Sequence, residues 1–259
     1  MSDPLLFALD VGNTETKLGL FAGRGLSHTW RLRTDRRRTA DEYAVVITQL
    51  FALAGADIGA VGSVVAASVV PDVDHFLSEA SLALFRRAPS FFRPTRQSIM
   101  SLATTNPGEV GADLVAAAIA ARERRGAPVI VVTFGTATAY AAVGREGAYE
   151  GVAIAPGIQI SVDALIRGTA KLPQVALESP AAAIGRTTVE ALQSGIIFGV
   201  VGQTEGIVAR FRAELGTEAP VLASGGLAGA VAAHTTVIDE VLPHLVLEGL
   251  AIYAEREVA

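Results

Sequence analysis

The chain has 259 residues, of which 51% are hydrophobic and 18% charged, so it is long enough to bury a sizeable core. It contains no cysteine, which excludes disulfides, zinc–thiolate centres and thiol nucleophiles. Its net charge of −5 argues against general nucleic-acid binding. The N-terminus lacks a signal pattern and the apolar run 61–70 is too short to span a bilayer, so we expect a cytoplasmic protein with no membrane partner.

The first half of the chain alternates predicted strands and helices. Apolar runs flank a short polar turn and predict a β-hairpin over 5–21. The next expected elements are a strand at 26–33, a helix at 41–54, a strand at 60–67, a helix at 73–84 and a loop at 86–94. An Ala-rich helix then begins near Asp113, where a carboxylate is electrostatically favoured, so Asp113 is a candidate helix cap as well as a candidate catalytic group.

The second half repeats this pattern. The expected elements are a hairpin over 129–143, a strand at 151–157, a helix at 158–166, a long helix that follows Thr187-Thr188 and runs to 212, a strand before Gly225 and a helix at 245–257. Gly195, Gly199 and Gly202 in the long helix would let another helix pack closely, as at a dimer interface. The repetition predicts two fused halves, residues 1–120 and 121–259.

The turn of the first hairpin carries groups that suit a nucleotide phosphate and its magnesium ion. These groups belong to Asp10, Gly12, Asn13, Thr14 and Lys17. Their spacing is not that of a P-loop, and similar residues also make ordinary turns. Lys17 and Lys171 are the only lysines in a chain that otherwise uses arginine, which suggests that a compact ammonium matters in this turn.

Two later segments resemble this turn. Residues 133–138 again join two apolar runs, and aligning Gly12 with Gly135 pairs Asp10 with Thr133. A third glycine-rich segment, 224–228, follows another apolar run, where it would let the backbone approach a nucleoside or would simply turn a strand into a helix. The three segments together indicate a duplicated α/β protein with a phosphate loop in each half.

The order of the short motifs along the chain is more specific than any one of them. They include Asp10-x-Gly-Asn-Thr, Asn106-Pro-x-Glu-Val-Gly-Ala-Asp113, Phe134-Gly-Thr-Ala-Thr138, Ile154-Ala-Pro-Gly157, Thr169-Ala-Lys-Leu-Pro173 and Ser224-Gly-Gly-Leu-Ala228. In this order they resemble the type III pantothenate kinases of the acetate and sugar kinase/Hsp70/actin superfamily. The resemblance implies an α/β fold of two duplicated ribonuclease-H-like, actin-like halves, each with a mixed sheet flanked by helices. It also implies ATP-dependent phosphorylation of pantothenate to 4′-phosphopantothenate, the first step of coenzyme A biosynthesis.

The resemblance also assigns roles to residues. ATP phosphates and Mg²⁺ would be held by Asp10, Gly12, Asn13, Thr14 and Lys17. Thr136 would contact the terminal phosphate, and the adenosine would lie near Ser224, Gly225 and Gly226. Asp113 would be the general base for the substrate's primary hydroxyl. The pantothenate pocket would be lined by Gly111, Ala112, Asp113, Leu114 and Thr188. The family further implies a homodimer whose active site borrows from the neighbouring subunit.

Five positions depart from the family's pattern. Leu114 stands where the family has arginine, Ala117 where it has asparagine, and Ala139 and Ala141 where it has polar residues. Thr133 replaces an aspartate that helps to bind K⁺ or NH₄⁺, so this monovalent-cation position is expected to be degraded. Two alternatives to pantothenate kinase follow: a paralogue that phosphorylates another small alcohol, and a non-catalytic nucleotide-binding regulator.

Overall fold

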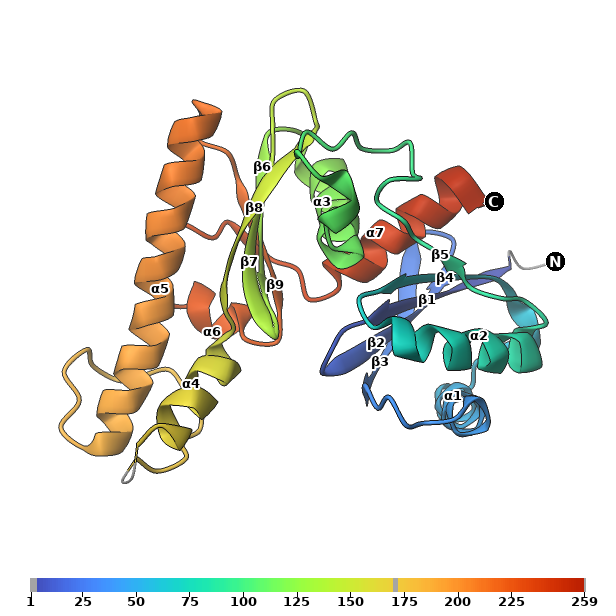
Figure 1. Ribbon diagram of the computed structural model, residues 1–259, viewed down its shortest axis with the longest axis horizontal. Helices are drawn as coiled ribbons and strands as arrows, with labels where there is room; N and C mark the ends of the chain where they lie inside the picture. The colour runs from blue at the N-terminus through green and yellow to red at the C-terminus, as the bar shows by residue number, and fades with distance from the viewer. Residues whose placement is uncertain (1–3, 170–171, 259) are drawn as a thin grey trace. The chain divides into compact units, whose positions relative to one another are not determined.

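The computed structural model describes residues 4–169 and 172–258, so Ala170 and Lys171 lie outside the described residues. The part that is described forms two compact units, whose elements are drawn in Figure 1. Unit 1 comprises Met1–Ala120 and Leu245–Ala259, and unit 2 comprises Ala121–His244. No helix in the described ranges combines the length and the apolar character needed to cross a membrane.

Unit 1 is built on a mixed β-sheet with helices packed against it. Its strands are β1 (Leu5–Val11), β2 (Glu15–Ala22), β3 (Gly25–Arg33), β4 (Val61–Ser68) and β5 (Ser90–Phe91). Its helices are α1 (Ala40–Ala54), α2 (Pro71–Phe85), most of α3 (Ala112–Arg125) and α7 (Leu245–Tyr253), with 3₁₀ turns at Ile58–Ala60 and Pro107–Glu109 and a π-helical turn at Ala254–Val258. Within the described residues the strand order is β3-β2-β1-β4-β5, with β1 antiparallel to β2 and parallel to β4.

Unit 2 repeats this arrangement. Its strands are β6 (Val129–Phe134), β7 (Ala137–Val143), β8 (Tyr149–Pro156), β9 (Val221–Gly225) and β10 (Glu240–Val241). Its helices are α4 (Ile158–Arg167), α5 (Thr188–Leu215) and α6 (Ala228–Ala232). The order β8-β7-β6-β9-β10 matches that of unit 1 strand for strand, with the same parallel and antiparallel pairings. The prediction of an α/β protein with two duplicated, ribonuclease-H-like halves is confirmed.

The last helix packs with the unit that is distant from it in sequence. The sequence prediction placed residues 245–259 in the second half, whereas α7 packs on β1, β2 and β4 of unit 1. Gly249 approaches Ala116 so closely that a Cβ at position 249 would collide with the Ala116 carbonyl group. Helix α7 therefore completes the core of unit 1, a long-range association that no local pattern reveals.

Local sequence signals set the ends of the helices, and apolar burial fixes them on the sheets. Thr39 and Glu42 form a reciprocal capping box at the start of α1, which ends at Gly55 in the left-handed conformation. Phe51 of α1 and Phe85 of α2 pack with Phe7 of β1, and the three ring centroids lie 5.3 to 5.8 Å apart. Each such buried side chain contributes roughly 1.5–3 kcal/mol by leaving water, so this cluster is a major source of stability in unit 1.

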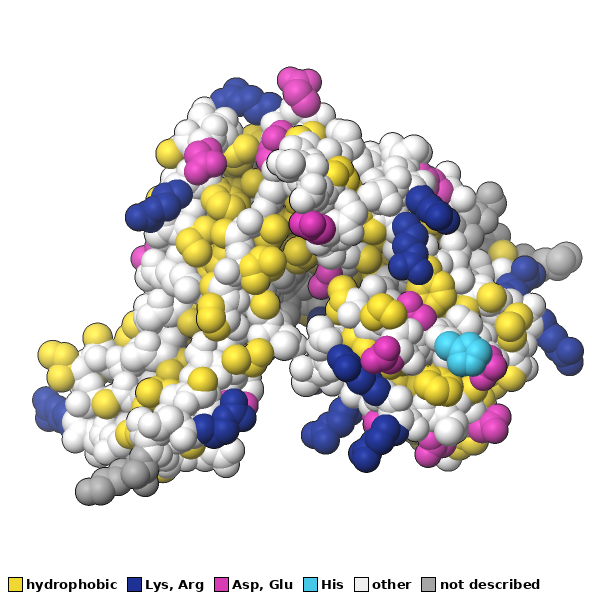
Figure 2. Space-filling model, in the orientation of Figure 1, with side chains coloured by type: hydrophobic (Ala, Val, Ile, Leu, Met, Phe, Trp, Pro, Cys, Tyr) yellow, Lys and Arg dark blue, Asp and Glu magenta, His cyan; other side chains and the backbone are white. Residues whose placement is uncertain are grey.

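Part of unit 2 has an exposed apolar surface. On the outer strand β8 the side chain of Ile154 is 67% exposed, and Figure 2 shows hydrophobic side chains gathered over the strands of this unit. Along α5, a Cβ added at Gly195, Gly199 or Gly202 would meet no atom of the described residues within 4 Å. The face of α5 that carries these glycines is therefore open to close approach by another helix.

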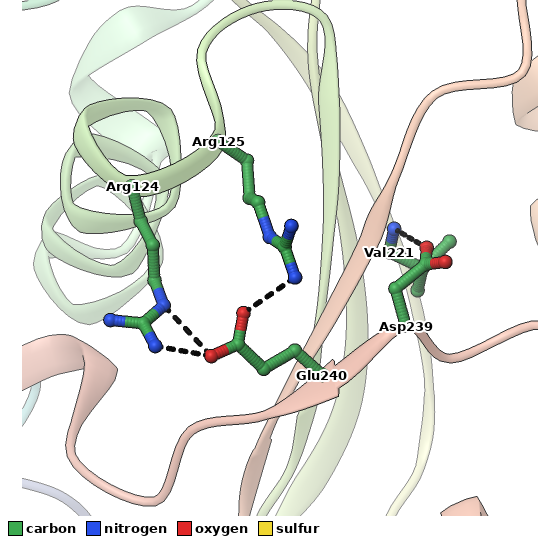
Figure 3. A network of polar contacts seen from close by, with 5 residues as sticks. All are labelled: Arg124, Arg125, Val221, Asp239 and Glu240. Atoms are coloured by element: carbon green, nitrogen blue, oxygen red, sulfur yellow. Dashed lines mark hydrogen bonds and ion pairs between the residues drawn. The ribbon is translucent and has the colours of Figure 1, made fainter.

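A charged cluster within unit 2 joins the last residues of α3, which belong to this unit, to the edge strand β10. Glu240 on β10 accepts hydrogen bonds from Arg124 and Arg125, with 2.9 Å between Arg125 Nη2 and Glu240 Oε2 (Figure 3). The preceding residue, Asp239, accepts a 2.7 Å bond from the backbone N–H of Val221. The bond to Asp239 ties the start of β10 to β9 and the arginine contacts tie β10 to α3, which supplements a ladder of only two backbone pairs.

Candidate active site

The first polar turn connects β1 to β2 and is tightly closed. The N–H of Gly12 donates a 3.0 Å hydrogen bond to the carbonyl of Glu15. A Cβ at position 12 would lie 2.9 Å from that same carbonyl oxygen, so glycine is required for this closure. Asn13 and Thr14 at the tip are exposed, as residues that contact a bound phosphate must be before it binds.

Asp10 and Lys17 face each other across this hairpin. They are register partners on β1 and β2, with 4.0 Å between Lys17 Nζ and Asp10 Oδ2. Burial raises the pKa of Asp10 to about 7; the positive charge of Lys17 opposes this shift, and the negative charges of Asp113 and Glu15 add to it. A bound cation would therefore stabilise the charged form of this buried carboxylate.

Asp113 lies in the first turn of α3 and belongs to the same electrostatic cluster. Burial raises its pKa, while the backbone N–H groups of Leu114 and of Asp113 itself lower it, as does the charge of Lys17. The carboxylate is the second residue of α3, where the backbone N–H groups of a helix start favour a negative charge. Its raised pKa also suits a general base, so a place in the first turn and proton transfer are compatible here.

The segment before Asp113 is shaped around its carboxylate. A Cβ at Gly111 would lie 2.6 Å from Asp113 Oδ1, so the neighbouring glycine leaves room for that oxygen. Ala112 is buried and Leu114 is half-buried. Leu114 brings no charge to Asp113, in line with its predicted departure from arginine.

Three of the other departures occupy core positions. Ala117, Ala139 and Ala141 are 0%, 6% and 2% exposed. A polar side chain at any of them would need a buried partner, and alanine removes that need. These substitutions are therefore explained by packing as well as by any change of substrate.

The residues present fit a magnesium ion bound together with a nucleotide. No cluster of three or more His, Cys, Asp or Glu side chains that could hold a metal occurs within the described ranges. Mg²⁺ does not require one, since it commonly binds through one or two carboxylates and completes its shell with phosphate oxygens and water. Asp10 offers one such buried carboxylate at the end of β1.

The second polar turn, between β6 and β7 of unit 2, is also closed by the N–H of its glycine, but the hydrogen bond reaches one residue less far along the chain than at Gly12. Gly135 donates a 3.0 Å hydrogen bond to the carbonyl of Ala137, and Thr136 at the tip is exposed. Thr133 pairs in register with Ala139 on one side and Ser224 on the other. Where unit 1 has Asp10 and Lys17, this position therefore has no charge.

The third glycine-rich segment lies beside this turn, because β9 runs parallel to β6. Ser224 is buried, and Gly225 has φ +104° with a Cβ position that overlaps the carbonyl of Phe134. The structure thus brings Thr133, Ser224 and Gly225 together at the carboxyl ends of two strands. Thr188 is elsewhere in unit 2, exposed at the first residue of α5, and no hydrogen bond or ion pair described here joins it to the turn.

Gly225→Ala is expected to lower the free energy of unfolding by about 2 kcal/mol or more, because the side chain would be strained and would collide with Phe134. Gly226→Ala is the matched control, since a Cβ there meets no described atom within 4 Å. Denaturant titration of both variants measures the difference. Equal stability of the two would show that the strand end is not as tightly packed as described.

Sequence reasoning missed hydroxyl groups that surround the two turns. Thr16 is fully buried on β2, and Thr34 follows directly after β3. In unit 2 the buried hydroxyl of Thr138 has no hydrogen-bond partner among the described residues. The one available signal was position, since a residue just beyond a predicted strand lies at the same sheet edge as the turn.

Two like-folded units, each with a closed polar turn between its first two strands, define a protein of the actin-like class of kinases and ATPases. The family model of type III pantothenate kinase matches residues 6–210. Curated relatives named type III pantothenate kinase are 46% identical over 97% of this chain, covering 99% of the proteins from Anaeromyxobacter sp. (strain Fw109-5) and Moorella thermoacetica and 98% of the one from Myxococcus xanthus. The chain belongs to the type III pantothenate kinase family.

Solved structures with low sequence identity share the fold. Component A of (R)-2-hydroxyglutaryl-CoA dehydratase from Acidaminococcus fermentans matches with a TM-score of 0.51 at 14% identity, over 97% of this chain and 96% of its own. An ethanolamine utilization protein from Carboxydothermus hydrogenoformans matches with a TM-score of 0.54 at 14% identity, over 98% and 91%. At such identities the likeness concerns the fold alone.

Proposed function

We propose that this chain transfers the γ-phosphoryl group of ATP to the primary hydroxyl of pantothenate, giving ADP and 4′-phosphopantothenate. It belongs to a family of phosphotransferases, and this is the family's activity. The observation that carries the assignment is the cluster of Asp10, Lys17 and Asp113 beside the closed turn at Gly12. One buried carboxylate for the metal, one for the proton and one ammonium for phosphate are the groups that this reaction needs.

In the reaction, Asp113 accepts the proton of the pantothenate hydroxyl as its oxygen attacks the γ-phosphorus in line. Asp10 would hold Mg²⁺, which supplies charge neutralisation at the phosphates when bound. Lys17 is placed to balance the charge that develops on the phosphoryl oxygens, while Gly12, Asn13 and Thr14 bind phosphate through the turn. Gly111, Ala112 and Leu114 would line the pantothenate pocket next to the base.

The corresponding residues of unit 2 would bind the rest of the nucleotide. Thr136 at the second turn is proposed to contact the terminal phosphate, with Ser224, Gly225 and Gly226 near the adenosine. Thr133 offers a hydroxyl where a carboxylate would bind K⁺ or NH₄⁺. We therefore expect a kinase that works without a monovalent cation.

A homodimer is the assembly that the surface of unit 2 favours. The open glycine face of α5 and the exposed Ile154 on β8 are both features that a second copy of the chain could cover. In such a dimer the exposed Thr188 would complete the pantothenate pocket of the partner subunit. The cytoplasm, which supplies ATP and pantothenate, is the proposed location.

Purified protein is expected to release ADP from ATP when pantothenate is present and not in its absence, at equal rates in potassium and sodium buffers. A coupled ADP assay measures this directly, with omission of pantothenate as the control. A rate that requires potassium would show that Thr133 still serves a cation site. No ADP in either buffer would count against the proposed activity.

The two alternatives predict other outcomes in the same assay. Because Leu114 removes a cation from the pocket, a paralogue would release ADP with a different, less acidic primary alcohol and not with pantothenate. A regulator would bind ATP without any turnover. Calorimetric titration of ATP beside the ADP assay separates these two cases.

A further inference from the structure

The phosphate-type turn of unit 1 is held from behind by a threonine that follows the third strand. Thr34 Oγ1 donates a 2.7 Å hydrogen bond to the carbonyl of Gly12, and the Thr34 N–H donates a 3.0 Å bond to the carbonyl of Thr14. Thr34 Oγ1 also lies 2.8 Å from Thr16 Oγ1. One residue outside the turn thus contacts both ends of its tip.

Proton counting fixes the direction of these bonds. A threonine hydroxyl has one hydrogen, and a carbonyl oxygen can only accept, so the hydrogen of Thr34 goes to Gly12. Thr16 must then donate to Thr34. The result is a chain of hydrogen bonds from a fully buried residue of β2, through Thr34, to the backbone of the turn.

The orientation of the turn's backbone follows from these contacts. In a trans peptide the C=O and the following N–H point in opposite directions. With the carbonyl of Gly12 drawn toward Thr34, the N–H of Asn13 is therefore aimed away from it. A set of backbone N–H groups held in this way is the kind of site that binds phosphate.

Unit 2 supports its own turn from the equivalent position. The residue after its third strand is Gly157, which lies so close to the turn that a Cβ would lie 2.5 Å from the Gly135 oxygen and overlap that of Thr136. Unit 1 uses hydrogen bonds where unit 2 uses close backbone contact. In both units the residue that follows the third strand supports the polar turn.

From this we infer that Thr34 is a positioning residue for nucleotide binding, acting through the backbone of Gly12 and Thr14. The inference rests on the proposed function, since it concerns the same phosphate site. Thr34 would not itself contact the reacting atoms. It fixes the direction of the donors that do.

The test compares Thr34→Val, which keeps the shape of the side chain and removes its hydroxyl, with Thr34→Ser, which keeps the hydroxyl. Thr48→Val is the matched control, because the Thr48 hydroxyl donates a 2.8 Å bond to Ala44 on an exposed face of α1. We expect Thr34→Val to weaken binding of ADP with Mg²⁺ and to raise the KM for ATP by about tenfold or more, while the KM for pantothenate changes by less than about threefold. Thr34→Ser should restore the values to within about threefold.

Thr16→Val gives a second, milder variant, expected to change the same constants in the same direction by a smaller factor. The inference would be overturned if Thr34→Val and Thr48→Val had the same affinity for ADP and the same KM values. An equal rise in the KM for ATP and in the KM for pantothenate would also overturn it. If wild-type protein binds ADP but does not phosphorylate pantothenate, the proposed function fails, and the ADP titrations still decide the role of Thr34.

Discussion

Asp113→Asn is expected to reduce kcat by about 10²- to 10⁴-fold while leaving ATP affinity within a few-fold of wild type. The amide cannot accept the proton of the attacking hydroxyl, but it has the shape of the carboxylate and its oxygen remains a hydrogen-bond acceptor near the N–H groups at the start of α3. The fold should therefore survive the change. Single-turnover kinetics together with ATP titration separate the loss of chemistry from a loss of binding.

The control for this variant is Asp72→Asn, the same chemical change at an exposed carboxylate on α2 that pairs with Arg36 at 3.6 Å. It should keep wild-type kcat. Turnover by Asp113→Asn at the wild-type rate would rule out proton transfer by Asp113. The residue would then serve only as a favourable negative charge in the first turn of α3.

Asp10→Asn is expected to abolish Mg²⁺-dependent turnover and, at the same time, to stabilise the metal-free protein above neutral pH. The carboxylate is buried, and its pKa of about 7 in the fold compares with 3.8 for an exposed group. Folding therefore takes up a proton between these two values. The stability linked to the protonated form is present below pH 3.8 and is lost as the pH rises through about 7.

The size of this effect is on the order of 4 kcal/mol across that range, since each pKa unit corresponds to about 1.4 kcal/mol. The Tm of the metal-free wild type should thus fall from pH 5 to pH 8 by more than the Tm of Asp10→Asn does. Adding Mg²⁺ with ATP should abolish the fall in Tm between pH 5 and pH 8 in the wild type. It should leave the pH profile of Asp10→Asn unchanged. The variant Asp72→Asn is the control and should follow the wild type. If Tm changes with pH in the same way in the wild type and in Asp10→Asn, the buried charge at position 10 is refuted.

Much of the fold was predictable because its signals are local. The hairpins at 5–21 and 129–143 are apolar runs around short polar turns, and the structure has β1–β2 and β6–β7 at these places. The capping box at Thr39 and the proline at the start of α2 mark helix ends in the same way. The motifs singled out Asp10, Lys17 and Asp113 one by one, and their electrostatic interaction within unit 1 became visible only in the structure.

The features of the site that could not be predicted from the sequence depend on contacts between residues that are distant along the chain. Thr34 becomes important only when β3 returns it to the turn at Gly12, twenty-two positions earlier. The shift in the pKa of Asp10 depends on burial, which a motif does not encode. The alanines at 139 and 141 looked like losses at a binding site until their burial showed that they are also core residues.

The discontinuity of unit 1 bears on how the chain folds during synthesis. Unit 2 is continuous in sequence, so it can form as soon as residues 121–244 have left the ribosome. The sheet of unit 1 emerges earlier, yet one face of β1, β2 and β4 lacks its covering helix until α7 is made. Unit 1 thus starts before unit 2 in the chain and is completed after it, and until α7 is made its apolar strands expose a surface of the kind that promotes aggregation.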